Sequence, residues 1–291
     1  MKTLKIWFAD FWPEIIYEDI FTPILSKYYN IVLDEKNPDV IFHSIFNGMK
    51  DINKYPNIKK ILWIAENYRA NQFKTDYTIS FDNHSTTNFR LPLWQAYLIK
   101  NPDLKDKLYT DKNKKDVIFN RFCSFTVSNG NNFIRNSIYN SLNSYKRVHS
   151  YGKYMTNDFS LQRINSNNKY WRDIKYDYFI NNTHKYSLCY ENSSHPLYCT
   201  EKLMDGFLGN SLPIYWGDSK AVNDFNERSF INVHQLMLTG SSVLDVIKKI
   251  DNSDNMFLDL YNEPVFTSEQ KNKLENNLAI FEEWLVDVIN K

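Results

Sequence analysis

The residues best suited to chemistry follow one predicted strand in the second half of the chain. An apolar run at 186–190 predicts a buried strand, and a polar turn leads from it to a helix that should begin near Thr200. In open α/β sheets, ligands bind beyond the carboxyl ends of strands, where the free N–H groups of a following helix favour phosphate. Lys202 can neutralise a diphosphate there, and Glu191 and Glu201 can accept hydrogen bonds from ribose or sugar hydroxyls. An ordinary helix start, with Thr200 as cap and Glu201 balancing the helix dipole, fits the spacing equally well.

Strand and helix patterns alternate through the first 110 residues. Short runs of β-branched and aromatic residues predict strands at 4–9, 31–33, 40–46, 61–65 and 77–81. Helices are expected at 17–29 and from Pro92, a residue suited to a first helical turn. A lysine-rich polar stretch at 111–116 is the expected hinge.

The same alternation restarts after this hinge. Strands are predicted at 122–127, 148–151, 186–190, 212–216 and 230–233, with helices at 133–145, 171–180 and 200–208. Two successive series of this kind predict an α/β protein with two Rossmann-like domains facing a cleft.

The tail of the chain predicts one further element. Thr267 and Gln270 have the spacing of a capping box, and apolar residues follow at helical spacing. We expect a long amphipathic C-terminal helix that packs across the two domains. The expected division is therefore 1–117 for the N-terminal domain, 118–266 for the C-terminal domain and 267–291 for the helix.

Charge and composition exclude several classes of protein. Lys and Arg number 35 against 34 Asp and Glu, so neither nucleic acid nor an anionic membrane surface is expected as the main partner. No uncharged run reaches the roughly 20 apolar residues of a membrane span; we expect a soluble chain with at most peripheral membrane association. Only seven glycines and no Gly-x-Gly-x-x-Gly occur, which excludes a dinucleotide-dependent oxidoreductase.

The cysteines indicate the compartment. Cys123, Cys189 and Cys199 are an odd number without paired spacing, which is typical of a reducing compartment such as the cytoplasm. None has a His or Cys neighbour at metal-ligand spacing, so buried structural thiols are expected.

Several motifs together resemble a known family. In the second half of the chain they are Phe125-Thr126-Val127-Ser128-Asn129, Ile134-Arg135-Asn136, Tyr139, Glu191-Asn192-Ser193, Tyr198, Thr200-Glu201-Lys202, Pro213-Ile214-Tyr215-Trp216-Gly217, Asp224-Phe225-Asn226 and Ser229-Phe230-Ile231-Asn232-Val233. In the first half they are Ile64-Ala65-Glu66-Asn67, Asp76-Tyr77, Phe81-Asp82 and Arg90-Leu91-Pro92-Leu93. This set resembles the bacterial branch of the α-1,3/1,4-fucosyltransferases, glycosyltransferase family 10.

The resemblance implies a GT-B arrangement of the two domains and an inverting transfer of L-fucose. The donor would be GDP-fucose, and the acceptor a 3- or 4-hydroxyl of GlcNAc or glucose in a galactose-containing oligosaccharide or lipopolysaccharide of the Lewis-antigen type. Glu66 matches the proposed general base. One base suffices, because the acceptor hydroxyl is deprotonated on one face while the nucleoside diphosphate leaves from the other. Spacing alone would make Glu66 a solvated acid at a strand end.

The resemblance also assigns the donor site. Arg135 and Lys202 match the positive pair that binds the diphosphate and stabilises charge as the donor bond breaks. Glu201 matches an acid that binds the ribose, Asn192 a donor contact and Tyr198 a ring that lines the donor site. Taken alone, Arg135 could be a surface cation and Tyr198 a core residue.

Some features depart from the family pattern. Leu197 stands where many relatives have an acid or glycine, and His195 occupies a position where the family does not require His. The heptad repeats and basic amphipathic tail of some bacterial members are absent, which leaves membrane association and oligomeric state open. No Asp-x-Asp occurs, so no cofactor and no built-in divalent metal are expected, although stimulation by a metal is left open.

Two alternatives remain from the sequence. One is a related transferase with a different nucleotide-sugar donor. The other is an inactive module that binds a sugar nucleotide or a glycan; the joint presence of Glu66, Arg135 and Lys202 weighs against it.

Overall fold

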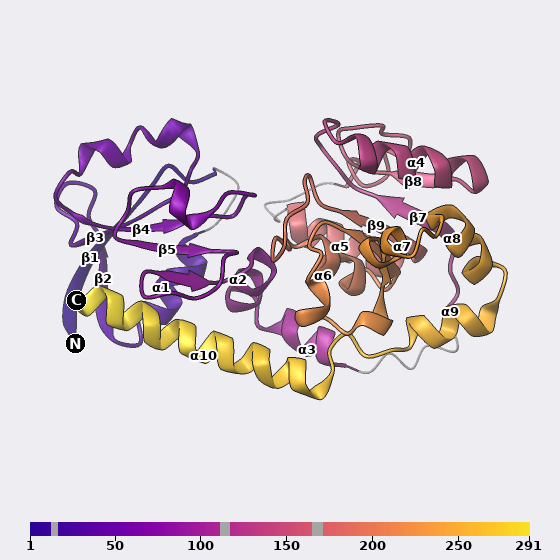
Figure 1. The fold of residues 1–291 in the computed structure, drawn as a ribbon. Helices are drawn as coiled ribbons and strands as arrows, with labels where there is room; N and C mark the ends of the chain where they lie inside the picture. The colour runs from indigo at the N-terminus through magenta and orange to yellow at the C-terminus, as the bar shows by residue number, and fades with distance from the viewer. Residues whose placement is uncertain (13–16, 111–116, 165–170) are drawn as a thin grey trace. The chain divides into compact units, whose positions relative to one another are not determined.

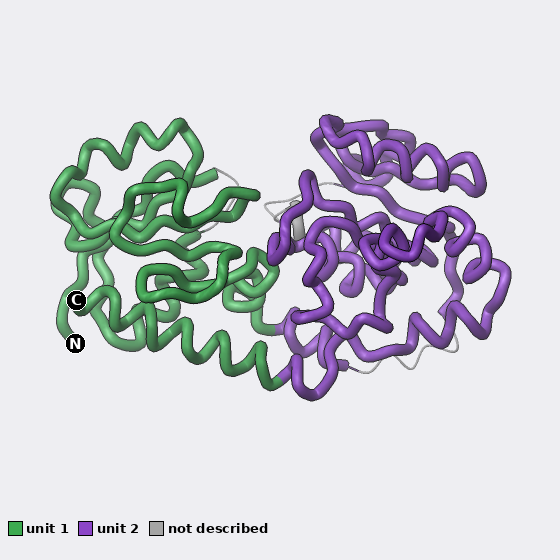
Figure 2. Tube along the Cα trace, in the orientation of Figure 1, with its two compact units in different colours: residues 1–102, 272–291 green, residues 103–271 purple. Residues whose placement is uncertain are grey.

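The computed structural model describes residues 1–12, 17–110, 117–164 and 171–291. They form two compact units (Figure 2): unit 1 comprises residues 1–102 and 272–291, and unit 2 comprises residues 103–271. The hinge expected at 111–116 lies outside the described residues. The domain boundaries and the cleft expected from the sequence stay predictions.

Unit 1 is built on a six-stranded parallel sheet with the order β2-β1-β3-β4-β5-β6 (Figure 1). Its strands are β1 (Lys2–Ala9), β2 (Tyr29–Leu33), β3 (Val40–His43), β4 (Lys59–Trp63), β5 (Tyr77–Ser80) and β6 (Asn88–Arg90). Its helices in this part of the chain are α1 (Glu18–Leu25), α2 (Leu93–Lys100), and the short 3-10 turns η1 (Asn47–Met49), η2 (Ile52–Lys54) and η3 (Ala70–Gln72). Because the central strands are buried on both faces, they read as continuous apolar runs in the sequence.

Helix α10 (Ser268–Asn290) begins with the predicted capping box. The Thr267 N–H donates to Gln270 Oε1 at 2.9 Å, and the Gln270 N–H donates to Thr267 Oγ1 at 3.2 Å. From residue 272 onward the helix belongs to unit 1, where the ring centroid of Phe281 lies 5.1 Å from that of Phe89. The expected long C-terminal helix is confirmed.

Unit 2 contains a five-stranded parallel sheet with the order β11-β10-β9-β7-β8. Its strands are β7 (Arg121–Phe125), β8 (Val148–Ser150), β9 (His184–Tyr190), β10 (Leu212–Trp216) and β11 (Ile231–Asn232). Its helices are α3 (Asp103–Tyr109), α4 (Phe133–Tyr145), α5 (Trp171–Asn181), α6 (Lys202–Leu208), η4 (Ala221–Asn223), η5 (Glu227–Ser229), α7 (Val233–Leu238), α8 (Val243–Asp251) and α9 (Asp254–Tyr261). Two parallel sheets with helical connections confirm the predicted α/β class.

Some elements differ from the prediction. The helix expected at 17–29 ends at Leu25, because Tyr29 already begins β2. The sequence does not predict β6, whose buried Asn88 accepts hydrogen bonds from side chains of β5 in place of an apolar contact. Helices α8 and α9 were also not predicted. Ser242 and Ser253 cap them by accepting from backbone N–H groups three residues ahead, and these two serines are the sequence signal for both helices.

Candidate functional site

The strand order of unit 2 marks one point at the carboxyl edge of its sheet. The chain leaves β7 toward β8 on one side and leaves β9 toward β10 on the other, so the connections diverge between β7 and β9. Ligands of open α/β sheets bind at such a switch point. The loops at this point, 126–132 and 191–201, are joined by a hydrogen bond that Asn132 Nδ2 donates to the Asn192 carbonyl at 2.8 Å. Two segments singled out from the sequence are therefore neighbours.

Arg135 lies in the first turn of α4, which follows the first of these loops. Asn132 caps the helix by accepting from the Arg135 N–H at 2.8 Å, and Arg135 Nη2 donates to the Asn129 carbonyl. Arg135 is only 2% exposed, and its Nε has no hydrogen-bond partner among the described residues. Burial lowers the pKa of Arg135, and the charge of Glu191 opposes this shift. A buried guanidinium N–H without a protein acceptor, at the start of a helix, is suited to bind an anion.

Glu191, Thr200 and Lys202 form a cluster at the end of β9, which we call the β9 clasp; Glu191 and Thr200 are buried and Lys202 is partly exposed. Glu191 is fully buried; its Oε1 accepts from the Thr200 N–H at 2.8 Å and its Oε2 from the Thr200 hydroxyl at 2.6 Å. Lys202 Nζ lies 3.2 Å from a carboxylate oxygen of Glu191 and also 3.2 Å from one of Glu201. Burial lowers the pKa of Lys202, but the two carboxylates outweigh burial and raise this pKa well above its usual value. The ammonium of Lys202 is therefore charged.

The β9 clasp changes two interpretations from the sequence. Glu191 was expected to accept hydrogen bonds from a ligand, but its buried carboxylate already contacts Thr200 and Lys202, so in this structure it positions the loop. Thr200 does not cap α6, because the N-cap residue is Glu201 and no side chain caps the helix.

A second buried carboxylate holds the middle of the same loop. Asp218 Oδ1 accepts from the N–H groups of Leu197 at 2.6 Å and Lys220 at 2.7 Å. Leu197 has a φ of 72°, a left-handed conformation that glycine would adopt without strain. Tyr198 is only 1% exposed, and its hydroxyl donates to Asn192 Oδ1 at 3.0 Å. Sequence reasoning missed Asp218, although a Gly-Asp pair directly after a strand is a turn signal.

Gly217 lies against the β9 clasp. A Cβ atom at this position would lie 2.2 Å from Glu191 Cγ, so the approach requires glycine. Gly217→Ala should displace Glu191 and lower the free energy of unfolding by about 1–3 kcal/mol, the usual cost of overpacking. Denaturant unfolding measures this. Gly240→Ala is the control, because Gly240 has a φ of 67° and nothing within 4 Å of a Cβ. Equal losses for both variants would show that contact with Glu191 does not matter.

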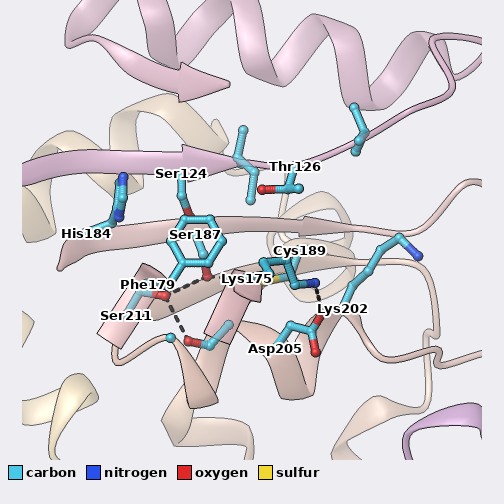
Figure 3. A pocket seen from close by; sticks show the side chains of 14 residues that line it. Ser124, Thr126, Lys175, Phe179, His184, Ser187, Cys189, Lys202, Asp205 and Ser211 are labelled. Carbon is cyan, nitrogen blue, oxygen red and sulfur yellow. Dashed lines mark hydrogen bonds and ion pairs between the residues drawn. The ribbon is translucent and has the colours of Figure 1, made fainter. Parts of the chain in front are cut away.

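A small cavity lies between the sheet of unit 2 and helices α5 and α6 (Figure 3). Its volume is about 50 Å³, and hydroxyl groups such as those of Ser187 and Ser211 line it. Lys175 pairs with Asp205 in its wall, while the Lys202 side chain runs away from that pair. Ligand pockets measure roughly 300–1,000 Å³, so the cavity is too small for a nucleotide.

Glu66 lies in unit 1, in the loop after β4. Its side chain is half-buried. The loop is tied to the loop after β5, because Arg69 Nη1 pairs with Asp82 Oδ1 at 2.6 Å while Arg69 Nη2 donates to Asn67 Oδ1 at 2.8 Å. Glu66 is therefore at the carboxyl edge of the unit 1 sheet. The other predicted site residues are at the corresponding edge of unit 2: Arg135, Glu191, Asn192, Tyr198, Glu201 and Lys202.

Further features of the described residues are their cysteines, their capacity to hold a metal ion and the capacity of their helices to span a membrane. The three cysteines are buried and free, as expected of structural thiols. In the part of the chain that the structure describes, no cluster of three or more His, Cys, Asp or Glu side chains could hold a metal ion. No helix of that part is long and apolar enough to cross a bilayer.

Two family profiles match the sequence. Residues 6–97 match the "Alpha-(1,3)-fucosyltransferase FucT N-terminal domain", and residues 112–277 match "Glycosyltransferase family 10 (fucosyltransferase) C-term". The chain belongs to glycosyltransferase family 10. The resemblance inferred from the motifs is confirmed.

This family 10 chain is similar to fucosyltransferases from a bacterium and an animal. It is 30% identical to the alpha-(1,3)-fucosyltransferase FucT of Helicobacter pylori over 95% of this chain and 63% of that protein. It is also 30% identical to the human 4-galactosyl-N-acetylglucosaminide 3-alpha-L-fucosyltransferase 9 over 47% of this chain and 35% of that protein. The family 10 chain thus spans less than two thirds of the length of either relative.

Solved structures of alpha1,3-fucosyltransferases have a similar fold. A crystal structure of an alpha1,3-fucosyltransferase with GDP-fucose aligns with 98% of this chain and 90% of its own, at a TM-score of 0.74 and 25% identity. A crystal structure titled only as alpha1,3-fucosyltransferase aligns over the same shares, with a TM-score of 0.75 and 26% identity.

Proposed function

We propose that this chain transfers L-fucose from GDP-fucose, with inversion, to a 3- or 4-hydroxyl of GlcNAc or glucose in a galactose-containing oligosaccharide or lipopolysaccharide. Membership of family 10 supports the proposal. The observation that carries it is Arg135 Nε, which is buried at the switch point of unit 2 without a partner among the described residues. A phosphate oxygen of the donor would supply the missing acceptor.

Binding of GDP-fucose would depend on hydrogen bonds from individual N–H groups of the protein to the diphosphate. Two cations, Arg135 and Lys202, lie with the carboxylates of Glu191 and Glu201, and the buried carboxylate of Asp218 holds the same loop. These five side chains carry no excess of positive charge that would attract the donor. As the bond between fucose C1 and the diphosphate oxygen breaks, Arg135 and Lys202 would stabilise the negative charge that grows on the leaving GDP. Glu201, whose side chain is 21% exposed, would accept hydrogen bonds from the ribose.

The acceptor side would depend on Glu66. Its carboxylate takes the proton of the acceptor hydroxyl while that oxygen forms the new bond to fucose C1 and GDP departs. A single displacement inverts the anomeric centre, and no second carboxylate is needed as a nucleophile. The proposal requires both units to contribute to one turnover.

A transfer assay tests this function. The protein is incubated with GDP-fucose and, in parallel, N-acetyllactosamine, lactose or the type 1 isomer, and NMR determines the linkage and anomeric configuration of the product. We expect α-linked fucose, which is inverted relative to the β-linked donor. Transfer from GDP-mannose or a UDP-sugar but not from GDP-fucose would overturn the proposed donor. Absence of any transfer would favour a binding module.

We also propose that the transfer needs no divalent metal. Two cationic side chains can neutralise the diphosphate, and the sequence has no Asp-x-Asp motif. With excess EDTA in the assay, kcat should stay within about twofold of its value in magnesium buffer, because the two side chains already neutralise the diphosphate. A twofold change in kcat corresponds to only ~0.4 kcal/mol of activation free energy. Loss of transfer in EDTA, with recovery on added Mg²⁺ or Mn²⁺, would contradict this.

A further inference from the structure

We propose that two exposed aromatic side chains of unit 1, Trp12 and Tyr68, form a platform that binds two linked sugar rings of the acceptor. The inference rests on the proposed function of Glu66. Tyr68 would hold the ring whose hydroxyl reacts, and Trp12 would hold the neighbouring ring.

The strand order of unit 1 points to the position of Trp12. The chain leaves β1 toward β2 on one side, while β3 and the later strands follow on the other side, so the switch point lies between β1 and β3 (Figure 1). Trp12 is in the loop after β1, at the carboxyl edge where ligands of such sheets bind. The loop after β3 brings Phe46 to the same place, and its ring centroid lies 5.4 Å from that of Trp12 in an edge-to-face arrangement.

The backbone beneath this aromatic pair is firmly held. The Ser44 N–H donates to the Ala9 carbonyl and the Phe46 N–H to the Asp10 carbonyl, each at 3.1 Å, so the two loops stay paired beyond the strands. Asp10 is buried, and its carboxylate accepts from the N–H groups of Asp51 and Ile52. The Trp12 end of the platform is therefore pre-organised, which reduces the entropy cost of binding there.

Trp12 and Tyr68 share an edge with Glu66. Ser44 Oγ donates to the Trp63 carbonyl at 2.8 Å and so joins the ends of β3 and β4, and the Tyr68 N–H donates to the Glu66 carbonyl at 2.7 Å. From β1 across β3 to β4 is two strand spacings, about 10 Å, a span comparable with two linked hexose rings.

Exposure distinguishes these two rings from the core aromatics. Trp12 is 46% exposed and Tyr68 is 47% exposed, whereas Trp63 and Trp94 are each 1% exposed. Large rings left in water are unfavourable, and the apolar face of a pyranose can cover them. Tyr28 is the contrasting case: it is 44% exposed, but its hydroxyl donates to Glu282 Oε1 at 2.8 Å, away from this edge.

The test compares a disaccharide acceptor with its reacting monosaccharide. Trp12→Ala should raise the KM for N-acetyllactosamine about tenfold, as loss of a binding hot spot does, and should change the KM for free GlcNAc far less, because free GlcNAc lacks the neighbouring ring. Tyr68→Ala should raise the KM for both acceptors. Trp12→Phe should restore most of the disaccharide affinity, and Tyr28→Ala is the matched control. Thermal melts establish that each variant is folded.

Saturation-transfer NMR without donor separates this inference from the proposed function. Wild-type protein should transfer saturation to N-acetyllactosamine, and Trp12→Ala should lose the signal of the galactose ring. That result supports the platform even if the protein does not transfer fucose. Wild-type KM and unchanged saturation transfer in folded Trp12→Ala and Tyr68→Ala would overturn the platform while leaving the transferase proposal standing. No binding of the glycan by the wild type would also overturn it.

Discussion

Glu66→Gln should lower the kcat of fucosyl transfer by about 10²–10⁴-fold, the contribution expected of a general base. Glutamine has nearly the same shape but cannot take the proton from the acceptor hydroxyl. GDP affinity should stay near the wild-type value, because Glu66 belongs to unit 1 and the proposed diphosphate-binding residues belong to unit 2. Product formation followed by NMR gives kcat, and calorimetry gives the GDP dissociation constant.

Glu283→Gln is the matched control for this variant. Glu283 is an exposed acid on α10 in the same unit, and its replacement should leave both constants unchanged. A kcat of Glu66→Gln within a few-fold of wild type would show that another group removes the proton.

Arg135→Met should weaken GDP binding and lower kcat by about 10²–10³-fold, comparable with removal of one donor that stabilises transition-state charge. Methionine fills most of the buried volume but has neither a charge nor an N–H for the diphosphate. It also leaves the Asn129 carbonyl without its donor, at a cost to the free energy of unfolding of about 1 kcal/mol. The kinetics are therefore paired with a thermal melt.

Arg228→Met is the control for Arg135. The Arg228 side chain is 68% exposed and pairs with Glu263 in the same unit, so its loss should affect neither GDP binding nor turnover. Wild-type GDP affinity in folded Arg135→Met would contradict the role given to the buried guanidinium.

Much of the fold could be predicted because parallel strands and helices have distinct apolar patterns. The strands at the centre of each sheet, such as β4 and β9, are mostly buried runs, and their short length between turn signals favours a strand over a buried helix. β6 could not be predicted in this way, since its pairing with β5 depends on the buried side chain of Asn88. The apolar pattern of a sequence indicates which strands and helices are buried, but it does not indicate a pairing that depends on one polar side chain.

The candidate site was predictable in position but not in detail. The junction after β9 follows from the rule for strand ends, and the family motifs added Arg135 and Glu66. The sequence could not distinguish a carboxylate that binds a ligand from one that accepts hydrogen bonds from the backbone. Glu191 and Asp218 are of the second kind, because both are buried and accept from N–H groups of the loop. That distinction depends on contacts between residues far apart in the chain.

The measurement that tests the central claim most directly is a crystal structure of the protein with bound GDP. We predict that the diphosphate lies at the switch point of unit 2, with one phosphate oxygen accepting from Arg135 Nε and another within reach of Lys202 Nζ. GDP bound elsewhere, or bound without contact to either cation, would contradict the account.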